Sequence, residues 1–270
     1  MIQILNKSFP RDVFTETELI YLKNFEDNSE FGIEKLWQEM DLVWDNFGLN
    51  NKLPFQFQDI GLFYSHPVWI LNGIFSSVDK LSLQNRNEIS KFINESSELR
   101  TIADFGGGFG QLACIISSNG SVDLSIDVIE PYPSKIAYHL LDSYSNIKIK
   151  PDLGSTMYDC IIAQDVLEHV ENPIKVAQDL TKHLNKDGYI IFANCFYPYI
   201  KCHLPANFHL ARTFAWIMSS AGLSLHHSLN NAPHIQVFVK QGRVNRVAII
   251  CKIWFSVLFY KLVLLKRRII

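Results

Sequence analysis

The 270-residue chain lacks several features that would each point to a particular class of protein. Its five cysteines include no C-x-x-C pair, so nothing indicates a structural zinc site, and we expect a reducing, cytoplasmic setting. The first residues carry no charged lead before a long apolar run, so we expect no signal peptide. Internal repeats and low-complexity segments are also missing, which argues against a solenoid or a disordered protein.

Acidic residues are missing from the last third of the chain. All 27 acids and 15 of the 25 bases lie in residues 1–187, whereas residues 188–270 carry ten bases and no acid. The formal net charge of −2 therefore hides a carboxyl-terminal segment of +10, with histidines not counted. This asymmetry predicts that one end of the protein faces an anionic partner, for which we favour a membrane surface over nucleic acid.

The apolar pattern predicts an α/β protein. Hydrophobic residues make up 48% of the chain, enough for one large domain with additions. Residues 1–99 indicate helices and loops, and from Arg100 onward short apolar runs alternate with helical windows. We therefore predict a Rossmann-like, doubly wound, mainly parallel seven-stranded sheet with an antiparallel last strand. The predicted strands are 101–105, 124–129, 147–150, 159–163, 189–194, 223–229 and 235–239. The predicted helices of this part are 110–118, 133–143, 173–184 and 211–221.

The stretch IADFGGGFG, residues 102–110, places four glycines in five positions between a predicted strand and a predicted helix. Absent Cβ atoms let the backbone approach a nucleotide-like ligand, and the helix amino terminus offers free N–H groups. Glu130 ends the next strand, where an acid can accept hydrogen bonds from both ribose hydroxyls. The glycines also fit the loose dinucleotide pattern over 108–113, but Asp104 would repel a pyrophosphate and suit a cationic ligand.

Four segments in order, ADFGGGFG, DVIEP, YDCIIAQDVLEHVENP and HLNKDGYIIFAN, resemble the motifs of class I S-adenosylmethionine-dependent methyltransferases. The resemblance covers about residues 100–239 and is nearest to the ubiquinone-type O-methyltransferases and the sugar and small-molecule methyltransferases. It implies S-adenosylmethionine as cofactor and O-methylation of a sugar, a lipid-linked glycan or a related small molecule. A quinone or phenol acceptor, an NAD(P)-dependent oxidoreductase and a non-catalytic cofactor-binding protein are the alternative hypotheses.

The resemblance also implies roles for individual residues. Asp104 and the glycine backbone would line the methionine part of the cofactor, and Glu130 would hold the ribose hydroxyls. Pro131 or Tyr132 would lie against adenine, while the residues that end the fourth strand would face the cofactor's amino group or the reacting centre. The predicted cofactor-binding residues are Asp104, Gly106, Gly107, Gly108, Gly110, Glu130, Pro131, Gln164 and Asp165.

An acceptor hydroxyl must lose its proton during methylation, usually to a base with a pKa near neutrality. The candidates are His169, which follows the fourth strand, and His203 and His209, which flank a loop expected at the same edge of the sheet. Each could instead have a structural role. Asp165, Glu168 and His169 also resemble a metal site proposed for some ubiquinone-type enzymes, but we expect no bound metal.

We predict three parts: a helical cap over the substrate (1–99), an S-adenosylmethionine-binding core (100–241) and a basic apolar tail (242–270). Residues 247–265 are largely apolar, interrupted by two lysines, and about long enough to span a bilayer. The bases in 243–270 favour attachment to an anionic membrane surface, and thus a cytoplasmic protein peripheral at the inner face of the membrane. A dimer contact, packing on the chain itself and a true span are the alternatives, so an oligomer stays open.

Overall fold

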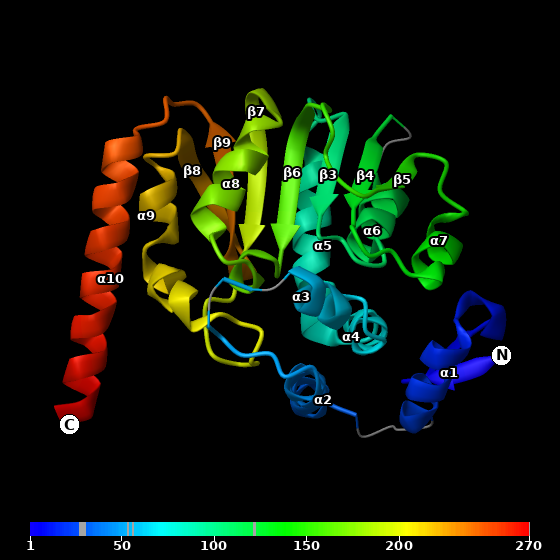
Figure 1. Cartoon of the computed structure of the whole chain (residues 1–270). Coiled ribbons are helices and arrows are strands. Elements are labelled where there is room, and N and C mark those ends of the chain that lie inside the picture. The colour runs from blue at the N-terminus through cyan, green and yellow to red at the C-terminus, as the bar shows by residue number, and fades with distance from the viewer. Residues whose placement is uncertain (27–30, 53, 56, 121–122, 270) are drawn as a thin grey trace. The chain divides into compact units, whose positions relative to one another are not determined.

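The computed structural model describes residues 1–26, 31–52, 54–55, 57–120 and 123–269 (Figure 1). Its larger sheet has seven strands in the order β5-β4-β3-β6-β7-β9-β8. The pairs β3–β4, β4–β5 and β6–β7 are parallel, whereas β9 is antiparallel to both β7 and β8. The predicted fold class is therefore confirmed, including the antiparallel last strand. The strands are β3 Thr101–Phe105, β4 Ser125–Ile129, β5 Ile147–Lys150, β6 Tyr158–Gln164, β7 Leu184–Ala193, β8 Leu223–Leu229 and β9 Ala232–Lys240.

The predicted strand boundaries differ most at β7, which begins at Leu184 and not at Tyr189. Leu184 pairs with Tyr158, and the register then shifts before Cys160 pairs with Tyr189. Asp187 has a φ of 60°, so the chain bulges here and rejoins the ladder. Apolar alternation, on which the prediction relied, is lost across such a bulge.

Helices account for most of the remaining described chain. They are α1 Glu16–Leu22, α2 Ile33–Asn46, α3 Phe57–Tyr64, α4 Val68–Ser76, α5 Lys80–Glu95, α6 Gln111–Asn119, α7 Lys135–Leu141, α8 Pro173–Lys182, α9 Phe214–Met218 and α10 Arg246–Ile269. Short 3-10 turns are η1 Arg11–Val13, η2 Lys23–Phe25, η3 Leu167–His169 and η4 Pro205–Arg212. A small hairpin of β1 (Ile2–Ile4) and β2 (Lys7–Phe9) was not predicted, because its turn places Leu5 and Asn6 at positive φ without a glycine signal.

The chain divides into two compact units, Met1–Gly154 and Ser155–Ile270. The first holds the hairpin, α1–α7 and β3–β5, and the second holds β6–β9 and α8–α10. This division falls inside the segment 100–241, which was expected to act as one functional core. The three-part organisation by function stays a prediction.

Each unit has its own apolar centre. In the first, the inner residues of β3 and β4 are buried, and α5 packs against α6. The α2 helix buries one face through Leu36, Met40, Val43 and Trp44. In the second unit Phe192, Phe214 and Phe238 form an aromatic cluster between α9 and the strands β7 and β9. These cores fix the strand ends from which the candidate site residues project.

Candidate functional site

The glycine turn after β3 depends on left-handed backbone. Gly106, Gly108 and Gly110 have φ angles of 72°, 54° and 73°, which L side chains rarely adopt. The N–H of Gly110 donates to the carbonyl of Gly107 at 2.8 Å, and α6 begins at the next residue. A Cβ placed on Gly108 would meet no described atom within 4 Å. The turn is thus tightly wound and open on one side, as a ligand-binding turn requires.

Asp104 lies directly beneath this turn. Its side chain is buried (2% exposed), and a Cβ on Gly107 would lie only 2.6 Å from its Oδ2. Within the part of the chain that the structure describes, Oδ2 has no hydrogen-bond partner. Burial raises the pKa of Asp104 to about 7; the Arg86 guanidinium opposes this rise and the Glu130 carboxylate adds to it. A buried acid with an unused oxygen beside an open turn suits a cationic ligand.

Glu130 joins the glycine turn to the loop after β4. Its Oε2 accepts the N–H of Gly108 at 3.1 Å, and its Oε1 accepts the N–H of Tyr132 at 2.9 Å. Burial raises the pKa of Glu130, and these two N–H groups act against that rise. Each carboxylate oxygen retains a second lone pair. Glu130 can therefore brace both loops and still accept hydrogen bonds from a pair of hydroxyls, with Pro131 next to it in the chain.

Two glycines of the N-terminal helices seat the aromatic residues of these loops. A Cβ on Gly73 of α4 would lie 2.5 Å from the Phe109 ring, and a Cβ on Gly61 of α3 would lie 3.2 Å from the Tyr132 hydroxyl. The rings of Phe109 and Tyr132 therefore occupy the space that these glycines leave. Neither contact was predicted, because an isolated glycine in a helix gives no hint of what packs against it.

Gln164 and Asp165 end β6 in the second unit. Asp165 has a φ of 54°, uncommon for a residue other than glycine, and its N–H donates to the carbonyl of Ala193 at 2.8 Å. The Nε2 of Gln164 donates to Oδ2 of Asp165 at 3.2 Å. The two side chains are thus held together at the carboxyl end of the strand. Their role toward a cofactor stays a prediction.

Two of the three candidate bases, His169 and His203, lie together. Their rings are 4.8 Å apart and nearly perpendicular, at 73°. Nδ1 of His169 lies 3.2 Å from the carbonyl of Cys202, and Nδ1 of His203 lies 2.8 Å from that of Tyr197. A carbonyl only accepts, so each Nδ1 carries the proton and each Nε2 is the basic nitrogen. Burial first, and then His203, lower the pKa of His169, which keeps this imidazole neutral near pH 7.

Glu168 completes this cluster. It is fully buried, its Oε1 accepts the N–H of Cys195 at 2.9 Å, and its Oε2 has no partner among the described atoms. Burial, and secondarily Asp165, raise its pKa. One potential ligand atom from each of Glu168, His169 and His203 lies within 4.8 Å of the others, so these residues could hold a metal ion. This group differs from the sequence pattern, which had Asp165 where the structure has His203. The expectation of no bound metal stays untested.

His209 lies in a different environment. It belongs to η4, and its Nδ1 lies 2.7 Å from the hydroxyl of Ser256 on α10. Burial lowers its pKa as well. The third candidate base therefore contacts the carboxyl-terminal helix, which the sequence pattern could not foresee. Its catalytic role stays a prediction, and its contact with Ser256 gives it a structural role.

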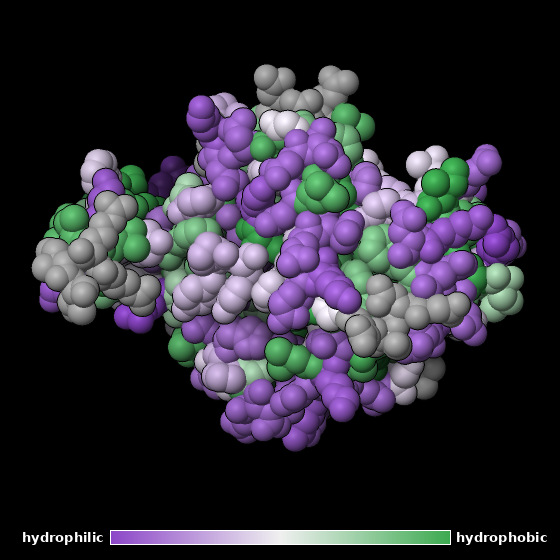
Figure 2. Space-filling model, turned by 90° about the horizontal axis from the view of Figure 1, so that it is seen from below, coloured by the Kyte–Doolittle hydropathy of each residue, from purple (hydrophilic) through white to green (hydrophobic). Residues whose placement is uncertain are grey.

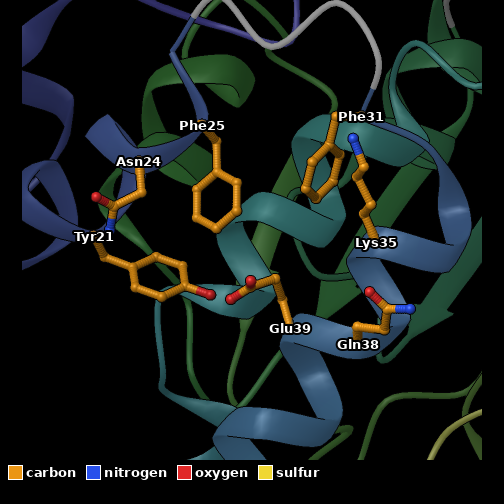
Figure 3. A pocket seen from close by; sticks show the side chains of 7 residues that line it. All are labelled: Tyr21, Asn24, Phe25, Phe31, Lys35, Gln38 and Glu39. Atoms are coloured by element: carbon orange, nitrogen blue, oxygen red, sulfur yellow. The ribbon is translucent and has the colours of Figure 1, made fainter.

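A cavity of about 530 Å³ lies within the first unit (Figure 3). It is lined by Phe31, which precedes α2, and by side chains from α1, η2 and α2: Tyr21, Asn24, Phe25, Lys35, Gln38 and Glu39. The Tyr21 hydroxyl points toward the Glu39 carboxylate in this view, and burial followed by that carboxylate raises the pKa of Tyr21. The Phe31 ring lies 6.2 Å from that of Phe75, near the end of α4. All residues that line this cavity belong to the segment 1–99, which was expected to cover the substrate.

Residues 78–238, more than half of the chain, match the model of the family described as "Methyltransferase domain". A ubiquinone biosynthesis O-methyltransferase of Nitrosomonas europaea is 26% identical over 156 residues, which are 55% of this chain. The match spans 65% of that relative, slightly less than two thirds of its length.

Two solved structures share the fold. An O-methyltransferase family protein from Burkholderia thailandensis superposes with a TM-score of 0.54 at 14% identity. The superposition covers 82% of this chain and 75% of that protein's chain. The mitomycin 7-O-methyltransferase gives a TM-score of 0.52 at 12% identity, and the superposition covers 85% of this chain and 74% of that enzyme's chain. The glycine turn with its buried acid, the fold and the family match agree: the chain belongs to the methyltransferase domain family.

Proposed function

We propose that this protein is an S-adenosylmethionine-dependent methyltransferase that transfers the methyl group to an oxygen of a small-molecule acceptor. Family membership supports methyl transfer. The observation that carries the choice of cofactor is the buried, unpaired Oδ2 of Asp104 beneath an open glycine turn. The ionised Asp104 carboxylate would repel a pyrophosphate at this turn, whereas it would attract a ligand with an ammonium and a sulfonium.

The residues of the first unit fit such a cofactor. Asp104 would attract the cationic methionine part, the backbone from Gly106 to Gly110 would lie against it, and Glu130 would accept the ribose hydroxyls. Pro131 would border the adenine. For Gln164 and Asp165, at the end of β6, a cofactor role is proposed from the resemblance alone. When bound, the cofactor supplies a methyl group already activated by its sulfonium, so the protein's main task is to align the acceptor and remove its proton.

The histidines are the candidates for removing the proton of the acceptor hydroxyl. His169 and His203 each present a basic Nε2, because their Nδ1 atoms donate to backbone carbonyls. The lowered pKa of His169 keeps its imidazole neutral near pH 7. We therefore propose His169, supported by His203, as the general base, with His209 as the remaining candidate.

The acceptor that we favour is a sugar, a lipid-linked glycan or a related small molecule, and the cavity of Figure 3 is a proposed binding place for it. Its three aromatic rings and its amide, ammonium and carboxylate groups are the combination that binds the faces and hydroxyls of a sugar ring. A quinone or phenol is the alternative acceptor, favoured by the name of the Nitrosomonas relative.

Calorimetric titration with S-adenosylhomocysteine and with NAD tests the cofactor. We expect S-adenosylhomocysteine to bind and NAD not to bind, and Glu130→Ala to weaken that binding at least tenfold. Lys91→Ala, on an exposed surface of α5, is the control and should bind as the unchanged protein does. Binding of NAD alone would favour an oxidoreductase. Binding of S-adenosylhomocysteine without turnover of any acceptor, with His169 and His203 replaceable, would favour a non-catalytic protein.

We further propose that the protein is cytoplasmic and peripheral at the inner face of the membrane, through residues 243–270. The cysteine pattern and the seven bases after Gln241 support this location. A lipid-linked acceptor would be presented at that same surface. An oligomer remains compatible with this proposal.

A further inference from the structure

The carboxyl-terminal helix α10 has two opposite stripes that are largely apolar. One, here called the packed stripe, recurs every three or four residues and is buried or half-buried: Ile249, Ile253, Ser256, Tyr260 and Val263. The other, here called the outer stripe, is exposed: Val247, Ile250, Trp254, Leu258, Leu262 and Leu265. Residues 246–266 are long and apolar enough to cross a membrane by length and composition. Figure 1 shows α10 running alongside α9, so only one side of the helix is covered by its own unit.

Polar contacts of Ser256, in the packed stripe, and of Lys252, beside it, hold this side of α10 in place. The hydroxyl of Ser256 is fully buried, donates to the carbonyl of His209 at 3.0 Å and lies 2.5 Å from the hydroxyl of Thr213. Nζ of Lys252 donates to the carbonyl of Trp216 at 2.6 Å and lies 4.9 Å from the centroid of the Trp216 ring. A helix that crossed the bilayer would strip these groups of their partners in hydrocarbon. The contacts therefore favour a helix that stays on its unit.

The outer stripe has the composition of a membrane-interface helix. Trp254 is 75% exposed and Leu258 is 57% exposed, although both are apolar side chains of the kind that folding normally covers. The segment 243–268 contains seven bases and no acid. Figure 2 views the molecule from below and shows hydrophobic and hydrophilic side chains side by side around the lower end of α10, at the left. Apolar residues among bases favour the headgroup region of an anionic bilayer.

A second copy of the chain fits the outer stripe less well. Lys261 is exposed on the same side of α10, three residues after Leu258 and four before Leu265. Two helices paired through this stripe would bring their Lys261 side chains into an apolar seam, and residues 188–270 offer no acid to pair with them. At a membrane the same lysine can extend to the lipid phosphates while its stem stays among the apolar side chains.

We propose that α10 is an in-plane anchor: its outer stripe enters the headgroup and acyl boundary of an anionic bilayer while its packed stripe stays on η4 and α9. The anchor lies parallel to the membrane surface and does not cross it. This inference rests on the surface of α10 and not on methyl transfer, so the two can fail separately.

The test is flotation of the full-length protein with vesicles of phosphatidylcholine alone and with vesicles that also contain anionic phosphatidylglycerol. We expect flotation with the anionic vesicles, and at least tenfold less with neutral vesicles. Leu258→Asp should lower flotation at least tenfold, and Trp254→Ser serves as a second, milder variant. The control is Leu81→Asp, because Leu81 on α5 is similarly exposed, at 63%, and should float unchanged.

Three results would overturn the proposal. The first is no flotation with anionic vesicles, or equal flotation of the unchanged protein and of both α10 variants. The second is a dimer in light scattering that Leu258→Asp dissociates while vesicles bind neither form, which would assign the outer stripe to a second copy. The third is bound protein that resists extraction by alkaline carbonate, as a spanning helix would.

Discussion

The contact between Gly73 and Phe109 gives a sharp test of how the glycine turn is held. In Gly73→Ala the new Cβ would lie 2.5 to 2.8 Å from three atoms of the Phe109 ring, closer than real Cβ contacts allow. Phe109 stands between Gly108 and Gly110, both at positive φ, so moving its ring disturbs the turn itself. Overpacking of this kind costs about 1–3 kcal/mol. Replacing glycine by alanine in a helix returns about 1 kcal/mol, so the net loss of folding stability should be about 0–2 kcal/mol.

The effect on ligand binding should exceed the effect on folding. If the ring moves rather than α4, the turn shifts and affinity for S-adenosylhomocysteine should fall about tenfold, equivalent to ~1.4 kcal/mol. Isothermal titration of Gly73→Ala, Phe109→Ala and the double variant measures this, and the double variant should lose less than the sum of the single losses. Asn72→Ala, the neighbouring α4 position, gives a helix-propensity control. An unchanged dissociation constant in Gly73→Ala, or strictly additive losses, would refute the reasoning.

Four further predictions concern charge and the acceptor. Asp104→Asn should weaken S-adenosylmethionine binding at pH 8 but little at pH 6, where a carboxyl with a pKa of about 7 is largely protonated already; titrations at both pH values decide this. The same raised pKa means that the ligand-free protein loses stability as pH rises from about 4 to about 7, and Asp104→Asn should remove that slope from thermal melts. His203→Gln should move the acid limb of the kcat profile to higher pH, because His203 helps to lower the pKa of His169; an unmoved limb would exclude His169 as the base. Gln38→Ala should raise KM for the acceptor about tenfold and leave KM for the cofactor unchanged, as steady-state kinetics would show.

The strands and the glycine turn could be predicted because their signals are local. The apolar runs of β3 and β5 have the observed boundaries, and four glycines in five positions leave few conformations other than a tight turn. The buried state of Asp104 was not predictable in the same way. It depends on Gly107 lacking a Cβ directly above the carboxylate, which is a contact in space and not a pattern in sequence.

The surroundings of the three candidate histidines could not be predicted from the sequence. His169 and His203 are 34 positions apart, and their proximity results from the loop after β7 returning to η3, where the N–H of Leu204 donates to the carbonyl of Glu168 at 3.0 Å. His209 looked equivalent to His203, because both lie in the segment after the fifth predicted strand. Its ring instead meets Ser256, a partner 47 residues away that no spacing rule would select.

The contact of His209 with α10 also links the proposed anchor to the proposed base. Ser256 of α10 contacts His209 in η4, and Asn207 in the same η4 segment donates to the carbonyl of Val170 at 2.8 Å. Val170 directly follows His169, so α10 and the candidate base are connected by two hydrogen bonds through one short helix. Because these bonds lie within a single unit, a membrane surface that holds α10 in its plane also fixes the orientation of η4 relative to that surface. Ser256→Ala should therefore lower kcat for a membrane-borne acceptor more than for a soluble analogue, and equal losses with both acceptors would separate the anchor from the base.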